Sequence, residues 1–600
     1  MEKIITALGE VEMTNIHIMM KELSINSYDK FWRWSVQNKY TFWEKTIEKL
    51  GIVFDEKYNS IVKVTNGVEN AEWLYGAKYN IIDSCFQADK DAIAIVYDKE
   101  NSLEKVTYQE LEVKVNTIAN GLVSKGVLVG DTVAIYMSMS VAAVAIYLAA
   151  IKTGCIVATI ADSFSVDEIT VRLKITKPKI IFTQESYTRA GKNHLLYQKS
   201  LEAGAHNCVV VEDELKKTFL KFGDVFFKDF LSSNISFTSV KVSPHHRSTI
   251  LFSSGTTGEP KAIPWSHITP IKSASEAYYH HDIKEGNVLC WPTNLGWMMG
   301  PWLVFASLIN KGTIALYSGS PLENKFGEFV QNTQVSMLGV VPSIVKAWKL
   351  SRNMEGFDWR EIRCFSSTGE VSNPEEMSYL MSLANHKPVI EYCGGTEIGG
   401  GYIASTLVQE NKPSQFSTQT LGGEFVLLND KGEKDELGEV FLIPPILGLS
   451  TELLNRSHHD VYYKDVPKYK GNTLRKHGDE FLYLENGFYK ANGRVDDTMN
   501  LGGIKVSSVQ IEVVVNTLDF VKESAAIAVS SKNGGPSELV VYFVGSETEL
   551  ENEALKKVQN LIKSKLNPLF KVIDLVKIDN LPRTASKKLK RTELRNFYQT

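Results

Sequence analysis

The chain has 600 residues, of which 43% are hydrophobic and 23% charged, and its formal net charge is −4. Because a single hydrophobic core rarely grows past about 250–300 residues, this length predicts more than one domain. The composition is that of an ordinary soluble globular protein. The small negative charge argues against a protein that binds nucleic acid or a membrane surface.

Six cysteines are spread through the chain without a C-x-x-C pair: Cys85, Cys155, Cys208, Cys290, Cys364 and Cys393. This pattern argues against a zinc site or a disulfide framework and fits a reducing compartment. The first residues lack the apolar core of a secretory signal, and the longest apolar stretch, Val141 to Ile151, is too short to span a bilayer. We therefore expect a soluble, cytoplasmic protein without a membrane span.

The first 80 residues are rich in aromatic side chains at amphipathic helical spacing, as in Phe31-Trp32-Arg33-Trp34. Core packing is the simplest role for these side chains. From about residue 90 onward, short apolar runs alternate with helical patterns. We expect a helix from Tyr108 to Lys125, ending at Gly126, and strands at 92–97, 132–137, 180–183, 288–289, 313–317, 337–341 and 362–366. This alternation predicts βαβ units and a largely parallel sheet.

Two later regions depart from that pattern. Residues 405–475 are rich in turns, and the sequence Asn429-Asp430-Lys431-Gly432 separates two strand-like runs, which predicts a β-rich subdomain. The last hundred residues have their own pattern, with strands expected at 523–529, 538–544 and 571–578 and a helix at 553–566. We expect these residues to form a small α+β domain.

An apolar run from Thr249 to Phe252 leads into Ser253-Ser254-Gly255-Thr256-Thr257-Gly258, with Lys261 just beyond. Glycines and small hydroxyl residues let backbone N–H groups approach an anion, and Lys261 adds a positive charge. A surface turn is the simpler alternative. A Walker loop is excluded, because the spacing is wrong and Ala262 offers no hydroxyl for Mg²⁺. The stretch predicts a loop that holds nucleotide phosphates.

Four further motifs follow this loop in order. Gly369-Glu370 lies in a turn after a predicted strand. The stretch Glu391-Tyr392-Cys393-Gly394-Gly395-Thr396-Glu397 ends on a hydroxyl that can donate to a phosphate and a carboxylate that can bind Mg²⁺. Gly478-Asp479 offers a carboxylate to ribose hydroxyls and is followed by a dense segment from Gly493-Arg494 to Lys505. Leu581 to Lys588 completes the set. A glycine-rich loop with a solvated glutamate is the alternative for Glu397.

These five motifs together resemble those of the adenylate-forming superfamily, which includes acyl-CoA synthetases, peptide-synthetase adenylation domains and luciferases. The segment around Trp73 is similar to the acetyl-CoA synthetase branch, and residues 392–405 and 477–512 are most similar to plant-type acyl-activating enzymes. The resemblance implies an α/β fold with an N-terminal segment over residues 1–89. It also implies an AMP-binding domain of parallel-sheet subdomains plus a β-rich subdomain over 90–495, and a small mobile α+β lid over 496–600. The hinge position of the superfamily falls on Asp496.

The resemblance also implies a reaction in two halves. A carboxylic acid and ATP give an acyl-adenylate and pyrophosphate, and coenzyme A then displaces AMP. The implied catalytic residues are Thr396, Glu397, which holds Mg²⁺, and Lys588, which bridges the acid and the α-phosphate. The implied nucleotide contacts are Ser253, Ser254, Gly255, Thr256, Thr257, Gly258, Lys261, Gly369, Glu370, Glu391, Tyr392, Cys393, Thr396, Asp479, Arg494 and Lys505.

Two basic regions have simpler alternatives. Arg189 and Lys192 follow the strand at 180–183, where acetyl-CoA synthetases carry a two-arginine motif. The resemblance implies that these two residues bind coenzyme A, with Lys563 as a weaker candidate. Ordinary surface charge is the alternative. Lys588 lies in a basic C-terminal stretch of a kind that is usually solvated. Relatives carry glycine where Lys587 stands, so the assignment of Lys588 can be off by one residue.

The acyl pocket of acetyl-CoA synthetases is closed by a tryptophan two positions before the Thr-Glu pair, and here that position is Gly394. Trp297, Met298 and Met299 correspond to another wall of the pocket, and methionine adapts to irregular ligands. We therefore expect an acid longer than acetate. If the two methionines fill the space that the glycine leaves, the enzyme acts on short acids.

Two other functions stay open at this point. The chain can be an adenylation protein that loads an acyl group onto a carrier protein, or a nucleotide-binding regulator without catalysis. The acetyl-CoA-synthetase-like N-terminal segment and the lack of a carrier domain after Lys588 favour the ligase. The residues from Asn596 to Thr600 are not a peroxisomal tripeptide, which keeps the expectation of a cytoplasmic protein. The sequence names neither the acid nor the oligomeric state, and a homo-oligomer stays open.

Overall fold

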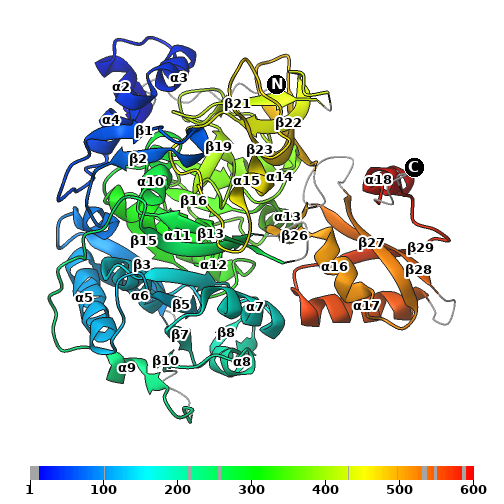
Figure 1. Ribbon diagram of the computed structural model, residues 1–600, viewed down its shortest axis with the longest axis horizontal. Helices are drawn as coiled ribbons and strands as arrows, with labels where there is room; N and C mark the ends of the chain where they lie inside the picture. The colour runs from blue at the N-terminus through cyan, green and yellow to red at the C-terminus, as the bar shows by residue number, and fades with distance from the viewer. Residues whose placement is uncertain are drawn as a thin grey trace.

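A computed structural model describes residues 12–99, 102–212, 219–253, 259–429, 431–495, 498–529, 537–545, 551–583 and 589–599. The chain forms a large body up to about residue 495 and a smaller C-terminal unit beside it, drawn in orange and red in Figure 1. No helix among the described residues is long and apolar enough to cross a membrane.

The first sheet of the large body contains seven described strands, in the order β11 (Val225–Phe226), β10 (Cys208–Val211), β7 (Ile180–Gln184), β5 (Thr132–Tyr136), β6 (Ile156–Ile160), β12 (Arg247–Ser253) and β13 (Lys261–Ser266). β5 runs parallel to β6 and β7, whereas β13 returns antiparallel along β12. The crossover from β5 to β6 is helix α6 (Val141–Lys152), which is buried continuously from Ala143. A helix without a polar face is covered on all sides.

The second sheet contains nine described strands, in the order β20 (Thr418–Gln419), β19 (Gly400–Ala404), β18 (Val389–Gly395), β17 (Cys364–Ser367), β16 (Met337–Val340), β14 (Val288–Cys290), β15 (Thr313–Leu316), β3 (Ile93–Lys99) and β4 (Ser102–Thr107). The helices of the large body that accompany the two sheets are α5 (Tyr108–Ser124), α7 (Val166–Thr176), α8 (Leu196–Glu202), α9 (Phe227–Phe230), α10 (Thr269–Tyr279), α11 (Met299–Ile309), α12 (Asn324–Asn332), α13 (Pro342–Ser351), α14 (Pro374–Leu383) and α15 (His458–Tyr462).

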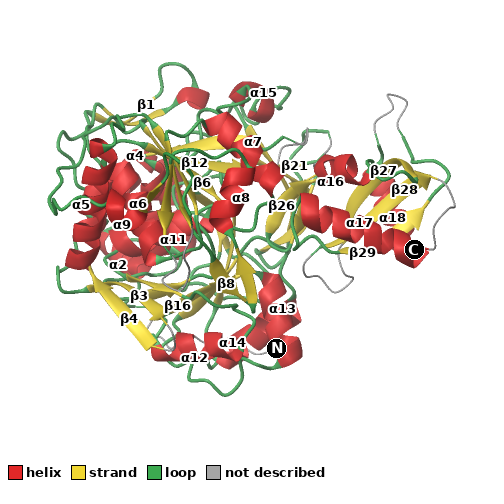
Figure 2. Cartoon of the chain, turned by 90° about the horizontal axis from the view of Figure 1, so that it is seen from below, coloured by secondary structure: helices red, strands yellow, loops and turns green. Residues whose placement is uncertain are grey.

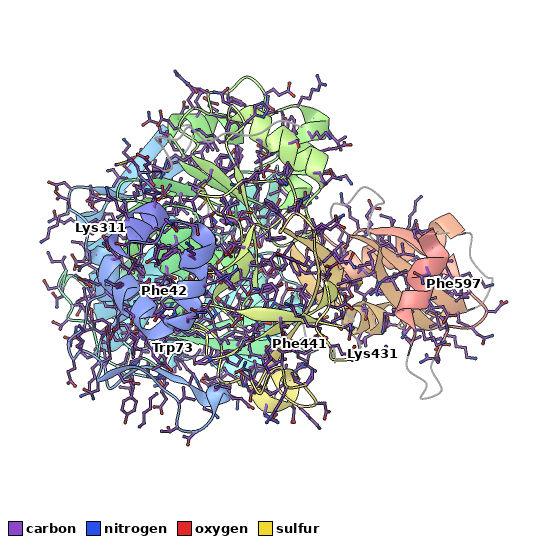
Figure 3. The ribbon with its side chains drawn as sticks, turned by 90° about the horizontal axis from the view of Figure 1, so that it is seen from above. Phe42, Trp73, Lys311, Lys431, Phe441 and Phe597 are labelled. Carbon is purple, nitrogen blue, oxygen red and sulfur yellow. The ribbon has the colours of Figure 1, made fainter. Side chains whose placement is uncertain are left out.

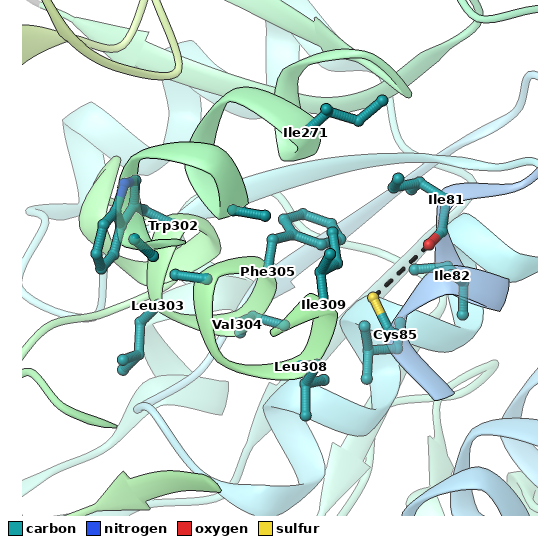
Figure 4. Close-up of a cluster of buried hydrophobic side chains, with 14 of the residues drawn as sticks. Ile81, Ile82, Cys85, Ile271, Trp302, Leu303, Val304, Phe305, Leu308 and Ile309 are labelled. Carbon is teal, nitrogen blue, oxygen red and sulfur yellow. Dashed lines mark hydrogen bonds between the residues drawn. The ribbon is translucent and has the colours of Figure 1, made fainter. Parts of the chain in front are cut away.

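The core between these layers is dense around α11. Figure 4 shows Trp302, Phe305 and their neighbours on α11 beside Ile81, Ile82 and Cys85, which come from the short 3-10 helix η2 (Ile81–Phe86). The thiol of Cys85 donates to the carbonyl oxygen of Ile81 at 3.7 Å. Side chains from residues more than two hundred positions apart thus share one cluster, which fixes the N-terminal region on the large body.

The N-terminal segment consists of α2 (Asn15–Glu22), α3 (Tyr28–Gln37), α4 (Lys39–Lys49), β1 (Ser60–Lys63), η1 (Val68–Asn70) and β2 (Glu72–Tyr75). Its aromatic side chains are core residues, as expected: Phe42 and Trp43 are 1% exposed. The hydroxyl of Ser35 accepts a hydrogen bond from the backbone N–H of Gly422 at 2.9 Å. In Figure 3 this segment, marked by Phe42 and Trp73, lies at the opposite end of the molecule from Phe597.

A β-rich part follows, but it extends beyond the predicted residues 405–475. Its strands β21 (Phe425–Leu428), β22 (Leu437–Leu442), β23 (Arg475–Tyr483) and β24 (Tyr489–Arg494) pair antiparallel in chain order. The C-terminal unit comprises the hairpin β25 (Thr498–Leu501) and β26 (Ile504–Ser507), the sheet β27 (Val521–Val529), β28 (Glu538–Gly545) and β29 (Val572–Lys577), and helices α16 (Ser508–Val515), α17 (Glu551–Lys565) and α18 (Arg591–Gln599). Figure 2 shows this unit as a compact α+β group to one side of the large body.

The predicted elements agree closely with the observed ones. Helix α5 begins at Tyr108 behind a capping box of Thr107 and Glu110 and ends just before Gly126, whose φ is 75°. The strand expected at 362–366 begins at Cys364 instead, because residues 359–362 make a turn in which the Ile362 N–H bonds to the Trp359 carbonyl. The expected hinge, Asp496, lies outside the described residues.

Candidate active site

The polar centre of the large body is built around Asp479 on β23. Asp479 stands opposite Arg494 of β24 in the strand register, and the Arg494 Nη1 donates to Asp479 Oδ1 at 2.8 Å. The hydroxyl of Tyr402, on β19, donates to Asp479 Oδ2 at 2.7 Å. Burial, followed by the charge of Asp479, raises the pKa of Tyr402 well above its ordinary value, so this hydroxyl stays a donor. The structure thus brings together the two predicted ribose contacts and adds Tyr402.

His477 is a second residue that the sequence reasoning missed. It lies two positions before Asp479, so both side chains share one face of β23. The His477 Nε2 lies 3.1 Å from Asp479 Oδ2, and its Nδ1 lies 3.9 Å from Glu397 Oε1. The ring also packs edge-on against Tyr402, with centroids 4.7 Å apart. Its position two residues before Asp479 in the sequence is the one signal that could point to it, because alternate residues of a strand share a face.

The predicted phosphate and Mg²⁺ contacts, Thr396 and Glu397, lie in the turn that follows β18. The indole Nε1 of Trp265 donates to the Thr396 carbonyl at 2.7 Å, and the backbone N–H of Ser450 donates to the Glu397 carbonyl at 2.7 Å. The backbone of this turn is therefore held from two other parts of the chain. Glu397 is buried, whereas Thr396 is half-buried.

The two ends of the predicted phosphate loop lie side by side. Ser253 ends β12 and pairs directly with Lys261 at the start of β13, while Ser254, Gly255, Thr256, Thr257 and Gly258 lie outside the described residues. The side chain of Asn455 accepts from the Ala262 N–H at 3.0 Å and donates to the Pro260 carbonyl at 2.9 Å. This clamp fixes the exit of the loop. There the Lys261 Nζ lies 5.2 Å from the centroid of the Tyr462 ring. Burial raises the pKa of Tyr462, and the charges of Glu397 and Arg494 also act on it, which links the loop to the polar centre.

Glu370 bonds to both parts of the chain, and its predicted place beside adenine stays a prediction. Its carboxylate accepts from the backbone N–H of Ser343 at 2.8 Å and from that of Gly503 at 2.8 Å. Gly503 belongs to the turn between β25 and β26 in the C-terminal unit, and burial raises the pKa of Glu370. Gly369, with φ of 93°, lies against the same turn. The two residues thus join the large body to the C-terminal unit.

The side chains of Glu391 and Tyr392 have partners outside the Asp479 centre, and their predicted nucleotide contacts stay a prediction. The Glu391 carboxylate is buried and accepts from the Ser372 hydroxyl at 2.6 Å and from the Ser414 N–H at 3.2 Å. Burial raises its pKa to about 7. The Tyr392 hydroxyl donates to buried Glu276. Both side chains are enclosed because the middle of β18 is covered on its two faces.

Cys393, the next residue, does reach the polar centre. Its Sγ lies 3.7 Å from Asp479 Oδ2 and 3.4 Å from the Tyr402 hydroxyl. It is half-buried, whereas the other five cysteines, all within the described residues, are buried.

Gly394 does not leave an open volume of the kind expected. A Cβ atom on Gly394 would lie 1.8 Å from the Gly400 carbonyl oxygen and 2.6 Å from the Gly401 Cα. The backbone of β19 therefore fills the space into which a side chain would project, which corrects the expectation of a missing indole. Met299 is 7% exposed within the core, and Met298 is half-buried beside Trp265 and its neighbours.

The predicted coenzyme A contacts lie on a hairpin of the large body. Arg189 ends β8 (Tyr187–Arg189) and Lys192 begins β9 (Lys192–His194); Arg189 Nη1 lies 3.9 Å from Asp162 Oδ2, and Lys192 is exposed. Trp297 packs edge-on against Phe164, with centroids 5.1 Å apart, and also against the core of the C-terminal unit. Lys565 of the C-terminal unit meets the large body: its carbonyl accepts from the Ser165 hydroxyl at 3.0 Å.

Lys588 lies outside the described residues, as does the side chain of Lys505. The chain is described up to Arg583 and again from Leu589. Arg583 Nη2 donates to Glu523 Oε2 at 2.6 Å, and the Lys590 N–H donates to the Pro582 carbonyl at 2.9 Å. Leu581 and Leu594 pack on the face of the sheet β27–β28–β29 opposite to the face whose core contacts Trp297. The chain on either side of Lys588 is thus anchored away from the large body.

The side chains of this site suit a cation that is bound mostly by the phosphates of a substrate. Within the described ranges, no group of three or more His, Cys, Asp or Glu side chains could hold a metal ion. A single buried carboxylate, Glu397, beside a predicted phosphate loop matches Mg²⁺, which is commonly bound by one or two carboxylates together with substrate phosphates.

Comparisons with known proteins agree with this geometry. The profile of the family described as "AMP-binding enzyme" matches residues 83–444, and that of the "Acetyl-coenzyme A synthetase N-terminus" matches residues 28–85. The chain is 43% identical to "Hexanoyl-CoA synthase" of Cannabis sativa over 602 residues, covering 96% of this chain and 84% of that protein. It is 42% identical to "Probable acyl-activating enzyme 17, peroxisomal" of Arabidopsis thaliana over 598 residues, covering 95% and 83%.

A solved structure has the same fold. The "Acetoacetyl-CoA Synthetase from Streptomyces lividans" matches with a TM-score of 0.77 at 23% identity, covering 99% of this chain and 94% of that one.

Proposed function

We propose that this chain, which belongs to the AMP-binding enzyme family, is an AMP-forming acid–CoA ligase. In its reaction a carboxylate oxygen of the acid bonds to the α-phosphorus of ATP as the bond to pyrophosphate breaks. The sulfur of coenzyme A then bonds to the acyl carbon as AMP leaves and the thiol proton is released. The observation that carries the proposal is the cluster of Asp479, Arg494 and Glu397, to which Lys261 of the phosphate loop is linked through Tyr462.

Each residue of the site has a role that follows from its position. Asp479 and Arg494 hold the ribose, Lys261 holds the outer phosphates, and Thr396 donates to the α-phosphate. Glu397 would hold Mg²⁺ together with the phosphates, and the cation would supply positive charge during the transfer. Catalysis then depends mainly on positioning and charge stabilisation. Lys588 bridges the acid and the α-phosphate in the first half-reaction, in a C-terminal lid over residues 496–600 that turns about Asp496.

The contacts of coenzyme A come from both parts of the chain. Arg189 and Lys192 on the hairpin of the large body provide positive charge for its phosphates. Trp297 and Phe164, which pack together where the large body meets the C-terminal unit, line the approach of its thiol arm. On the lid, Lys563 stays the weaker candidate, and Lys565, whose carbonyl accepts from the Ser165 hydroxyl, lies close to this approach.

The acid is longer than acetate in this proposal. The support is the 43% identity to a protein whose name is hexanoyl-CoA synthase, together with flexible Met298 in the predicted acyl wall. Gly394 does not widen the acyl pocket as expected. Its lack of a side chain instead lets β19 approach β18 closely.

A series of straight-chain acids from two to ten carbons tests the function. Pyrophosphate release with ATP, Mg²⁺ and coenzyme A should have its highest kcat/KM at a medium chain length. Each buried methylene contributes about 0.8 kcal/mol, so two or three carbons should change kcat/KM by roughly ten- to a hundredfold. An optimum at acetate would contradict the proposed acid. A product formed on a carrier protein but not on free coenzyme A would favour the carrier-loading alternative.

Nucleotide binding can be tested without the acid. Alkylation should modify Cys393 first, since the other cysteines are buried. ATP should slow that modification, because the Cys393 thiol lies 3.7 Å from the proposed ribose carboxylate. Equal labelling rates with and without ATP would contradict the placement of the nucleotide.

The compartment is a separate part of the proposal. We propose a cytoplasmic enzyme, although the Arabidopsis thaliana relatives carry the word peroxisomal in their names. Fractionation of cells that express the untagged chain distinguishes the two compartments.

A further inference from the structure

One buried arginine of the large body, Arg475, forms no ion pair with any residue that the structure describes. It begins β23 and is 0% exposed. Its Nη2 donates to the Ser450 hydroxyl at 2.8 Å, whereas its Nε and Nη1 have no hydrogen-bond partner among the described residues. A guanidinium keeps its charge in a protein, and an unpaired buried charge lowers the stability of the fold. This cost indicates that Arg475 has a role in binding an anion.

The first contact of Arg475 leads to the proposed Mg²⁺ ligand. Ser450 accepts from Arg475 with its hydroxyl, and its backbone N–H donates to the Glu397 carbonyl at 2.7 Å. Ser450 is itself buried, so both of its bonds are shielded from water. Arg475 thus supports, through one intervening residue, the turn that carries Glu397.

The second contact leads to the phosphate loop. The guanidinium carbon of Arg475 lies 4.0 Å from the centroid of the Tyr462 ring, at the end of α15, and the Lys261 Nζ lies 5.2 Å from the same centroid. An aromatic ring attracts cations, so one ring contacts both positive charges. Burial, followed by the charge of Arg475, lowers the pKa of His458 to about 4, so the imidazole that packs on Tyr462 stays neutral. Two cations on one ring repel each other less when an anion lies nearby, and the outer phosphates of ATP are such an anion.

We propose that Arg475 is a positioning residue for the triphosphate of ATP, and that it makes the site discriminate ATP from AMP. Through Ser450 it holds the turn of Glu397, and through the Tyr462 ring it holds Lys261. Its charge adds to that of Lys261 on the side of the site that receives the β- and γ-phosphates. The inference rests on the proposed function, since it concerns how the same site holds the part of ATP that leaves as pyrophosphate.

Arg475→Met tests the proposal, because methionine is long and flexible but carries no charge. With Mg²⁺ present and no acid, this variant should bind ATP about tenfold or more weakly, as residues one step removed from a metal commonly do. Its AMP affinity should stay within about threefold of that of the unmodified protein. A residue that only fills space gives another result. A shifted β23 also moves Asp479, so ATP and AMP affinities then fall together.

Lys476→Met is the matched control. It makes the same kind of change at the next residue, whose side chain lies on the opposite face of β23, so both affinities should stay within about twofold. Arg475→Lys keeps the charge but loses the flat group that lies on the Tyr462 ring. Its ATP affinity should fall about threefold, with AMP affinity unchanged. Calorimetry with AMP, and with ATP and Mg²⁺, gives these readouts on the intact chain, and thermal unfolding shows which variants are folded.

The outcomes are distinguishable. Equal losses of ATP and AMP affinity in Arg475→Met, or an unchanged ATP affinity, would overturn the proposal. If the methionine variant does not fold, Arg475→Lys decides. A loss confined to ATP then supports the proposal, whereas equal losses or no loss overturn it. If the unmodified protein binds neither AMP nor ATP, the proposed function fails, and the inference fails with it for a reason that is visible before any variant is made.

Discussion

The polar centre of the large body and the contact between the large body and the C-terminal unit differ in how far their charged groups are buried. In the centre, Asp479 is bonded by Arg494 and Tyr402 and faces His477, and the Asp479–Arg494 pair is at most 10% exposed. At the contact, the ion pair of Lys565 with Asp167 is 56% and 66% exposed. Exposed pairs contribute about 0–1 kcal/mol, whereas buried, charge-assisted bonds contribute more.

This difference indicates what each region does. A site whose donors and acceptors already face one another needs little rearrangement to bind a nucleotide. A contact held by the Glu370–Gly503 bond, the Ser165–Lys565 bond, the packing of Trp297 and an exposed ion pair can be broken and remade. The large body is thus suited to hold the nucleotide through both half-reactions, while the C-terminal unit is suited to change position between them.

The largest effect that we expect tests this division directly. Lys588→Ala should lower acid-dependent pyrophosphate release by about a hundred- to a thousandfold, because a charge that stabilises the transfer is lost. Thioester formation from supplied acyl-adenylate should be largely intact. Both rates can be measured by quenched flow with the same preparation.

Lys587→Ala is its matched control, and it should be nearly silent. If Lys587→Ala is the variant that stops pyrophosphate release, the assignment of the lysine is off by one residue. Equal loss of both half-reactions in Lys588→Ala would contradict a unit that moves between them.

The second effect concerns the buried centre. Asp479→Asn should weaken AMP binding by about a hundredfold, because it removes the charge that the Arg494 guanidinium faces and leaves Tyr402 and His477 around a neutral amide. Glu480→Gln, on the opposite face of β23, should bind AMP normally. Calorimetry on both variants checks this, and normal AMP binding by Asp479→Asn would show that the centre is not the ribose site.

The sequence predicted the members of the centre that stand in motifs. Asp479, Arg494, Thr396 and Glu397 are recognisable because their order along the chain matches a family, and the strands that carry them are short apolar runs. Tyr402 and His477 have no motif of their own. Their roles arise because β19 and β23, from different sheets, face each other, and one sequence does not show that pairing.

The predictions that the observed side-chain contacts do not support have an equally local cause. The sequence predicts Glu391, Tyr392 and Gly394 as ligand contacts because they precede Thr396-Glu397. Along β18, however, burial on both faces sends Tyr392 toward Glu276 and leaves no side-chain space at Gly394. Glu370 is at its predicted position, but its carboxylate bonds to the C-terminal unit, a contact between distant segments that sequence spacing does not show.

The third effect is on stability and tests whether buried Glu391 is protonated in the folded chain. Burial raises the pKa of Glu391 from an ordinary value of 4.5 to about 7, so the folded chain holds a proton that the unfolded chain releases. The free energy of unfolding should therefore fall as pH rises from about 4.5 to about 7, by up to about 3 kcal/mol from this group.

Glu391→Gln should remove that fall, because its amide keeps the shape without the charge. Denaturant unfolding at pH 5 and pH 8 measures the difference between variant and unmodified protein. A difference that does not change with pH would contradict a Glu391 that is protonated in the fold.

The smallest effect tests the contact between the two parts. Glu370→Gln replaces an oxygen that accepts from a backbone N–H, at Ser343 or at Gly503, by an amide nitrogen that cannot accept. Thioester formation from supplied acyl-adenylate should slow by about three- to tenfold, as a lost hydrogen bond of about 1 kcal/mol predicts, while pyrophosphate release should be nearly unchanged. Lys565→Ala removes the exposed ion pair with Asp167 and should change either rate less than about threefold. Glu370→Gln thus reverses the pattern of Lys588→Ala, because it weakens the arrangement in which Gly503 lies against the large body. If Glu370→Gln instead slows pyrophosphate release and leaves thioester formation intact, then this arrangement serves the first half-reaction, and the contact between the two parts must be assigned the other way round.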